Sequence, residues 1–193
     1  MANNVSNYLE MKGTEEVIAQ MDDLFDKARD CKYDEQMSTF VKTFYDNPGL
    51  GEDGKSTINA WMYDNAGVKW MYVEDCIGEG EWNIQSANYT PKEFWIRLYK
   101  LASKIDPEVV IEVKYQDEGY SPVGGFVIKK SPTSVIRWFE KEVFDLEDPT
   151  VDMNYGSDGY EDASQDFYEK VDDTQIECVS TCHEMIDSNK GNW

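Results

Sequence analysis

The sequence predicts an α+β protein with an acidic, mainly helical C-terminal part. Two patterns favour this class: short segments in which apolar and polar residues alternate, as in strands, and longer segments with apolar residues every three or four positions, as in amphipathic helices. The third observation is a formal net charge of −21 on 193 residues. Residues 142–193 hold 15 acidic and 2 basic side chains, a net of −13, which leaves −8 for residues 1–141. We therefore expect a sheet domain over residues 1–141 and an acidic appendage over residues 142–193.

The first half of the chain is predicted to form a strand, a helix and a hairpin. Residues 5–11 alternate like a strand, and apolar side chains recur at helical spacing through residues 14–28. After a connector rich in Gly and Asp, residues 68–77 and 81–87 predict two strands, with Gly78-Glu79-Gly80 between them. This spacing is typical of a β-hairpin.

A second helix and a second strand pair follow the hairpin. Pro91 marks the first turn of the helix, and Thr90 is its expected N-cap because its hydroxyl can accept a bond from a free backbone N–H. Residues 109–115 and 125–129 predict two strands, and we interpret residues 138–143 as a short helix.

The sequence also predicts the location of turns, the helices of the appendage and the arrangement of the sheet. Gly119, Gly124 and Gly125 are expected to serve turn conformations between the last two strands. Residues 162–171 and 176–186 predict two separate helices. Two helices on one face of an antiparallel sheet, joined in the order βα, ββ and αβ, form the ferredoxin-like arrangement, which we take as the predicted fold of residues 1–141.

Four motifs carry a resemblance to a known family. They are residues 3–8 (NNVSNY), 61–70 (WMYDNAGVKW), 88–91 (NYTP) and 117–126 (DEGYSPVGGF). In this order they resemble the YubB ferredoxin-like domain family of phages and plasmids, and the resemblance covers roughly residues 3–131. It implies a ferredoxin-like fold and an origin on a mobile element. The family carries no established activity, so the resemblance transfers no catalytic residue.

A phosphate-binding pattern lies in the connector before the hairpin. Residues 49–56 satisfy the P-loop pattern GxxxxGK[ST] through Gly49, Gly54, Lys55 and Ser56. A working P-loop has a buried strand before it and a long helix after it, so that backbone N–H groups converge on phosphate. Here a turn precedes the loop, and two acidic residues would sit inside the anion cradle. We therefore expect a Gly-rich connector, and a nucleotide-binding enzyme is the alternative.

No cofactor and no metal site is expected. Residues 152–158 begin like a calcium-binding loop, but Ser157 and Ala163 stand where the EF-hand requires a glycine and a bidentate glutamate. We interpret the four cysteines as free thiols. Cys178 and Cys182 could bind zinc with the histidine beside them, but no second ligand pair completes the shell, so we assign them to an apolar helix face. The chain has a single histidine, which argues against most acid–base mechanisms and catalytic triads.

The charge narrows the class of partner. A chain this acidic repels phosphate backbones and anionic lipid, so we expect no direct contact with nucleic acid and none with membranes. No apolar run approaches the length of about 18 residues that spans a bilayer, and we expect a cytoplasmic protein. The aromatic residues are expected in the core, because an aromatic platform for nucleic acid needs basic surroundings.

The appendage combines carboxylates with aromatic side chains that could anchor a partner. The candidate partner-binding residues are Asp145, Glu147, Asp148, Asp152, Asp158, Glu161, Asp162, Asp166, Glu169, Asp172, Asp173, Tyr155, Tyr160, Phe167 and Tyr168. The hypothesis is a non-enzymatic phage or plasmid accessory protein that binds and inhibits or modulates a basic host protein, such as a nuclease, a defence enzyme or a transcription factor, through a DNA-mimicking surface. A solvated acidic tail and a structural or assembly subunit of a phage particle stay open as alternatives.

Overall fold

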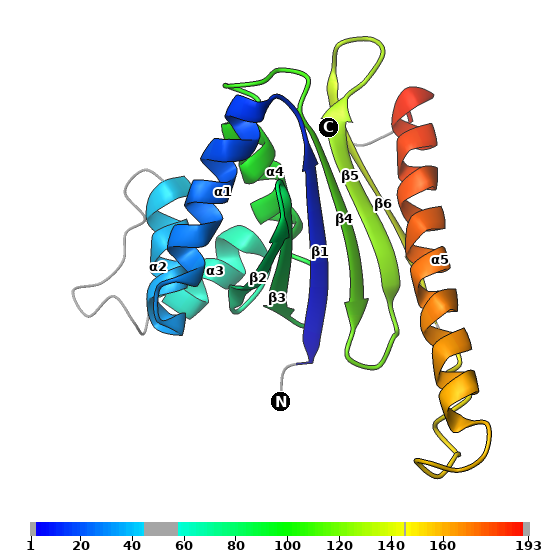
Figure 1. Cartoon of the computed structure of the whole chain (residues 1–193). Coiled ribbons are helices and arrows are strands. Elements are labelled where there is room, and N and C mark those ends of the chain that lie inside the picture. Colours follow the sequence, from blue (N-terminus) through cyan, green and yellow to red (C-terminus); the bar gives the residue numbers. More distant parts are fainter. Residues whose placement is uncertain (1–2, 45–57, 145, 191–193) are drawn as a thin grey trace.

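The chain folds around one six-stranded antiparallel sheet with the strand order β2-β3-β1-β4-β5-β6 (Figure 1). The computed structural model describes residues 3–44, 58–144 and 146–190. The strands are β1 (Asn4–Lys12), β2 (Met71–Gly78), β3 (Glu81–Ala87), β4 (Val110–Asp117), β5 (Val123–Lys130) and β6 (Ile136–Val143). The helices are α1 (Glu15–Arg29), α2 (Tyr33–Phe44), α3 (Ile58–Ala66), α4 (Lys92–Ala102) and α5 (Tyr160–Asp187). The predicted α+β class is confirmed.

The main core lies between the sheet and helices α1 to α4. We call this side of the sheet the first face. The register places Leu9 opposite both Trp82 and Val113, so these three buried side chains point to the same face. From α1, Phe25 stacks on Trp82 with 4.5 Å between the ring centroids. Burial of side chains of this size contributes roughly 1.5–3 kcal/mol each to folding.

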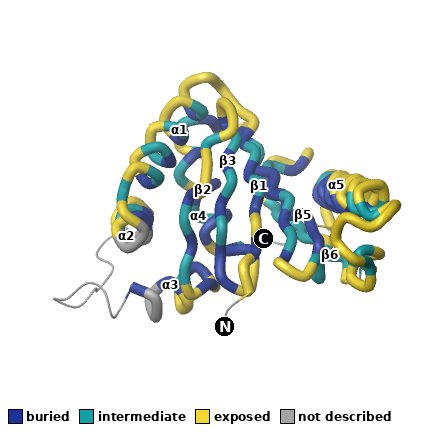
Figure 2. Tube along the Cα trace, turned by 60° about the horizontal axis from the view of Figure 1, so that its bottom comes forward, coloured by how far each residue is buried: buried dark blue, intermediate teal, exposed yellow. Residues whose placement is uncertain are grey.

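Of the helices that the structure describes, α5 is the one that covers the opposite side of the sheet, the second face. Figure 1 shows α5 beside β5 and β6, away from the other helices, and Figure 2 shows its buried residues turned toward the sheet. Two small apolar clusters join it to the sheet. One contains Val127 with Cys182 and Ile186, and the other contains Val123 with Phe167. Among the described helices, none packs on the second face of β1, β2 and β3.

Two adjacent glycines let elements approach both faces of β5. A Cβ atom on Gly125 would lie 2.8 Å from the backbone nitrogen of Val179 in α5, and a Cβ atom on Gly124 would lie 2.5 Å from Cζ of Tyr115. Real Cβ atoms do not come this close, so neither position accepts a side chain without movement. The expectation that Gly124 and Gly125 serve a turn is therefore wrong. They lie inside a strand, and their function is close packing.

Three local predictions are corrected by the structure. Residues 138–143 belong to β6 and not to a helix. The sheet is partly covered on both sides there, with Trp138 stacked on Phe126 of the first face and Phe139 against the α5 cluster, so the alternation that marks a strand is lost. The expected boundary between residues 141 and 142 falls inside this strand. Thr90 is not the N-cap of α4, because the helix begins at Lys92 and Pro91 occupies the N-cap position. The Thr90 hydroxyl instead accepts a bond from the Trp95 indole at 2.9 Å.

The third correction concerns α5, which is one helix where two were predicted. Gln175 interrupts the apolar pattern between Val171 and Cys178, and yet it occupies a buried position of the helix. Its side-chain amide donates to Oε1 of Gln116 on β4 at 3.3 Å. A paired polar residue at a core-facing position therefore hid the continuity of the helix.

Replacing Gly125 with alanine is expected to lower the free energy of unfolding by about 1–3 kcal/mol, because the new methyl group meets the backbone of α5. Urea unfolding followed by circular dichroism measures this loss. Gly78→Ala is the matched control, since a Cβ atom there would find its nearest neighbour at 3.5 Å, an ordinary contact. Equal urea midpoints for the two variants would contradict close docking of α5.

Candidate interaction surface on the C-terminal helix

The two sides of α5 have opposite chemistry. The side toward the sheet is buried and carries Phe167, Val171, Gln175, Cys178, Val179, Cys182 and Ile186. The side toward solvent carries six exposed carboxylates, which we call the acidic ridge. It consists of Asp162, Asp166, Glu169, Asp173, Glu177 and Glu184. Consecutive members are three, four or seven residues apart, with Ser180 at the one interruption, so they share one face of the helix.

The ridge is long and regular. From Asp162 to Glu184 the ridge extends over about 33 Å at 1.5 Å per residue. The mean spacing between neighbouring carboxylates is therefore about 6–7 Å along the helix axis. One strand of B-DNA carries a phosphate per about 3.4 Å of axis. Within the described part of the chain, no ion pair involves any of the six carboxylates. The ridge therefore offers a row of negative charge that intramolecular contacts do not neutralise.

The structure places the candidate residues of α5 in three groups. Asp162, Asp166, Glu169 and Asp173 lie on the acidic ridge. Glu161, Tyr168 and Asp172 are exposed on a flank of the helix, and the ring of Tyr168 packs 6.1 Å from that of Tyr120, while Tyr160 is half-buried at the first turn. Phe167 is 3% exposed and packs against the sheet, so it holds the helix and is not a surface anchor.

Sequence reasoning missed two members of the ridge. Glu177 and Glu184 lie beyond the polar break at Gln175, and they join the other carboxylates only because the helix is continuous. The signal that could have found them is the spacing of the carboxylates themselves, which keeps the helical period through the break although the apolar pattern does not.

The segment before α5 carries the other candidates. Glu147, Asp152 and Asp158 are exposed, and Tyr155 is 91% exposed, with its ring 5.4 Å from that of Tyr160. Asp148 is engaged locally, because its Oδ1 accepts bonds from the backbone N–H and the hydroxyl of Thr150 at 2.8 and 2.7 Å. Asp145 lies outside the described residues.

A groove separates this segment from the first half of α5. We call it the end groove, and its volume is about 670 Å³. It is lined by Glu147, Asp148, Pro149, Val151, Asp152, Asp166, Phe167 and Lys170. Four carboxylates face one ammonium group there, and Val151 is 77% exposed. Acidic and apolar groups are thus combined at the end of the ridge where α5 begins.

A buried carboxylate on the second face contributes to the attachment of α5. Glu112 of β4 accepts one bond from His183 of α5 and another from Lys12 of β1, each at 2.8 Å. Burial alone would raise the pKa of Glu112, but the hydrogen bonds and charges of His183 and Lys12 outweigh it and lower that pKa to about 2. Near the end of the helix, Asp187 pairs with Lys129 of β5 at 2.9 Å.

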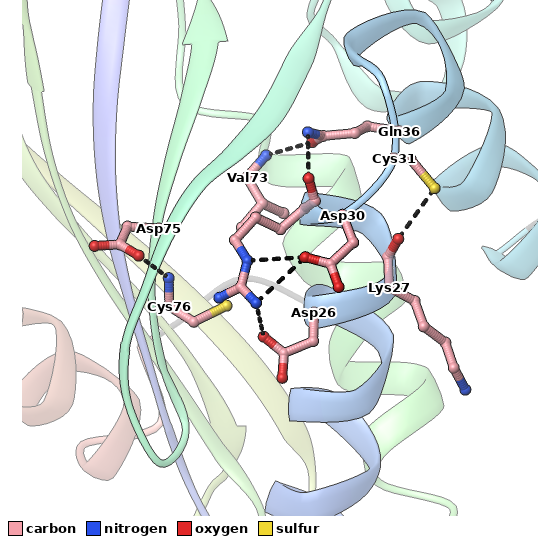
Figure 3. Close-up of polar contacts among 9 residues, drawn as sticks. Asp26, Lys27, Asp30, Cys31, Gln36, Val73, Asp75 and Cys76 are labelled. Atoms are coloured by element: carbon pink, nitrogen blue, oxygen red, sulfur yellow. Dashed lines mark hydrogen bonds and ion pairs between the residues drawn. The ribbon is translucent and has the colours of Figure 1, made fainter.

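Two of the cysteines, Cys76 and Cys182, are held as protonated thiols. Burial raises the pKa of the Cys182 thiol to about 12, and His183 turns to Glu112 and not to a thiol. Figure 3 shows Cys76 of β2 against α1, near Asp26. Burial and the nearby Asp26 carboxylate raise the pKa of the Cys76 thiol to about 12. Both thiols therefore stay protonated at neutral pH, a state that is poorly nucleophilic. All four cysteines are free, as expected.

The other predicted sites give no cluster. Gly49, Gly54, Lys55 and Ser56 lie outside the described residues. Across the described ranges, no group of three or more His, Cys, Asp or Glu side chains is placed to hold a metal ion. In those same ranges, no helix combines the length and the apolar character that crossing a bilayer requires.

Comparisons with protein-family models, with curated proteins and with solved structures found no match for this chain. The geometry of α5 and its neighbours is therefore the basis for inferring a function.

Glu112→Gln is expected to destabilise the protein by about 2 kcal/mol at pH 7 and by much less at pH 2. The pKa of Glu112 lies below its ordinary value of 4.5, so its stabilisation is complete above that value and is lost as the pH falls toward 2. Urea unfolding at both pH values measures the difference. Glu108→Gln, which changes an exposed carboxylate just before β4, is the control. A destabilisation by Glu112→Gln that is equal at the two pH values would contradict the assignment.

Proposed function

We propose that this chain is a non-enzymatic interaction protein that binds a basic host protein through the acidic ridge of α5 and the neighbouring segment 147–158. The observation that carries the proposal is the alignment of six exposed carboxylates on the outer side of a helix whose inner side is docked on a sheet. Negative charge that is both aligned and unneutralised attracts positively charged surfaces over long range.

Docking makes the ridge a stronger ligand than a flexible acidic tail would be. A disordered segment loses conformational entropy when it binds, and this loss reduces its affinity. The backbone of α5 is already fixed by the apolar clusters, Gly125 and the Glu112–His183 contact, so only side-chain freedom is lost on binding. Exposed apolar and aromatic side chains near the ridge, above all Val151 and Tyr155, can supply contact energy that charge alone does not.

The inferred targets are proteins that normally bind nucleic acid. The ridge has a lower charge density than one strand of DNA, but it has a similar linear form, and the carboxylates of segment 147–158 add charge at one end. A basic groove that binds a phosphate backbone is therefore complementary to this surface. A nuclease, a defence enzyme or a transcription factor of the host fits this description, and occupation of its groove by a DNA mimic would inhibit or modulate it.

We also infer a ferredoxin-like unit and an origin on a mobile element. The sheet order β2-β3-β1-β4 and the placement of α1 and α4 on the first face support the first inference, with β5, β6 and α5 as additions to that unit. The four motifs between residues 3 and 126, which resemble the YubB ferredoxin-like domain family, support the second. A phage or plasmid protein has a reason to act on host nucleases and regulators, which is consistent with an inhibitory interaction.

Neutralising the ridge is expected to weaken binding to the host target by about tenfold or more. The variant is Asp166→Asn, Glu169→Gln, Asp173→Asn and Glu177→Gln combined. Each exposed charge contributes about 0.2–1 kcal/mol, so four together give a measurable loss. Tagged wild type and variant are used to capture proteins from a host lysate, and the affinity for the recovered protein is then measured over a range of salt concentrations.

The matched control neutralises four exposed carboxylates far from α5, with Glu15→Gln, Glu16→Gln, Glu79→Gln and Glu93→Gln. Both variants have the same net charge. We expect the control to bind almost as wild type does, and the affinity of wild type to fall steeply with salt. Equal losses in the two variants, or an affinity that is indifferent to salt, would refute the proposed surface.

A further inference from the structure

The end groove has features that the rest of the acidic surface lacks. The ridge is a convex row of charge, whereas the end groove is concave, with walls from segment 147–152 and from α5. Its lining includes the apolar residues Pro149, Val151 and Phe167, of which Phe167 is almost fully buried. Val151 is 77% exposed although it is apolar, so covering it with a partner is favourable.

The charged groups around these apolar residues come from both walls. Asp152 belongs to the segment, and Asp166 belongs to the helix. Glu147, Asp148 and Lys170 also line the groove, so its four carboxylates and one ammonium give a net charge of −3. An occupant that fits must therefore bring an apolar stem together with a positive head group.

Arginine has this combination in the form that the groove favours. Its stem is a hydrocarbon chain that can lie on apolar side chains, and its planar guanidinium has five donors that can bond two carboxylates at once. Lysine has a similar stem, but its compact ammonium is more strongly hydrated, so it loses more hydration free energy when a partner covers it. An arginine side chain thus complements both the apolar lining and the carboxylates on the two walls.

We propose that the end groove receives one arginine side chain of the basic partner, with its stem against Val151 and Pro149 and its guanidinium between Asp152 and Asp166. This inference rests on the proposed function and deepens it. The ridge supplies attraction to any basic surface, and the end groove selects a surface with a projecting arginine. The contact combines apolar burial with charge, as the anchors of interfaces do.

The test compares two synthetic peptides of equal charge with the full chain. One alternates arginine with glycine, and the other alternates lysine with glycine, so they differ in the head group and not in net charge. Fluorescence anisotropy measures their affinities at low salt. We expect wild type to bind the arginine peptide about three- to fivefold more tightly.

Two variants separate the groove from the ridge. Asp152→Asn combined with Val151→Ser removes one carboxylate and the exposed apolar wall, and it is expected to bring the ratio of the two affinities close to one. Glu177→Gln combined with Glu184→Gln removes ridge charges outside the groove lining. This variant is expected to lower the affinity for both peptides by the same factor and to leave the ratio of the two affinities unchanged. All four side chains are exposed, so folding is little affected.

The outcomes distinguish failure of this inference from failure of the proposed function. Equal affinities of wild type for the two peptides, with strong salt dependence, would overturn the arginine site and leave the acidic surface standing. A preference for arginine that survives in the groove variant would overturn the site as well. No binding of either peptide at low salt would overturn the proposed function together with this inference.

Discussion

The close approach of α5 to the second face of the sheet is the constraint on which the outer surface depends. Gly125 allows the helix backbone to lie against β5, and the small apolar clusters around Cys182 and Phe167 hold it there. An isolated helix with this excess of like charge would be marginal in water, because nucleation is costly and the carboxylates repel one another. Tertiary packing on one side of α5 is therefore what makes an ordered row of carboxylates possible on the other side.

Polar contacts between α5 and the sheet help to hold this acidic helix in place. Glu112 is buried between Lys12 and His183, and Lys129 pairs with Asp187, so α5 meets positive or hydrogen-bonding groups where it approaches the sheet. Among the described residues, no ion pair involves the ridge carboxylates, although Glu169 accepts a hydrogen bond from Gln165 at 3.2 Å. Their mutual repulsion is tolerated because they face water. A basic partner would relieve that repulsion, which gives binding an electrostatic driving force beyond the pairwise contacts.

Much of the fold follows from periodicity, and the differences have identifiable causes. Strands that are buried on one face, such as β1, keep the alternation that predicts them, and the apolar stripe of α1 fixes its helix. The pattern fails where tertiary contacts replace local ones: Trp138 and Phe139 are partly buried on opposite faces, and Gln175 is buried through a bond to Gln116. The close packing at Gly125 could not be predicted locally, because it depends on the helix α5 that lies against this residue in the folded chain. The sequence predicted an acidic surface, but its full length depends on the continuity of α5, which the break in the apolar pattern at Gln175 concealed. The end groove depends on where segment 147–152 lies, which no local signal gives.

Amide hydrogen exchange of the full chain, followed by NMR, tests most directly whether α5 is a fixed platform. If α5 is an integral part of the fold, the amides of residues 171–186 exchange only in the same cooperative opening as those of β4 and β5, with protection close to the global free energy of unfolding. If those amides instead exchange at rates typical of a frayed or isolated helix while β4 and β5 remain protected, the helix is not held by the sheet, and the ordered acidic ridge does not exist.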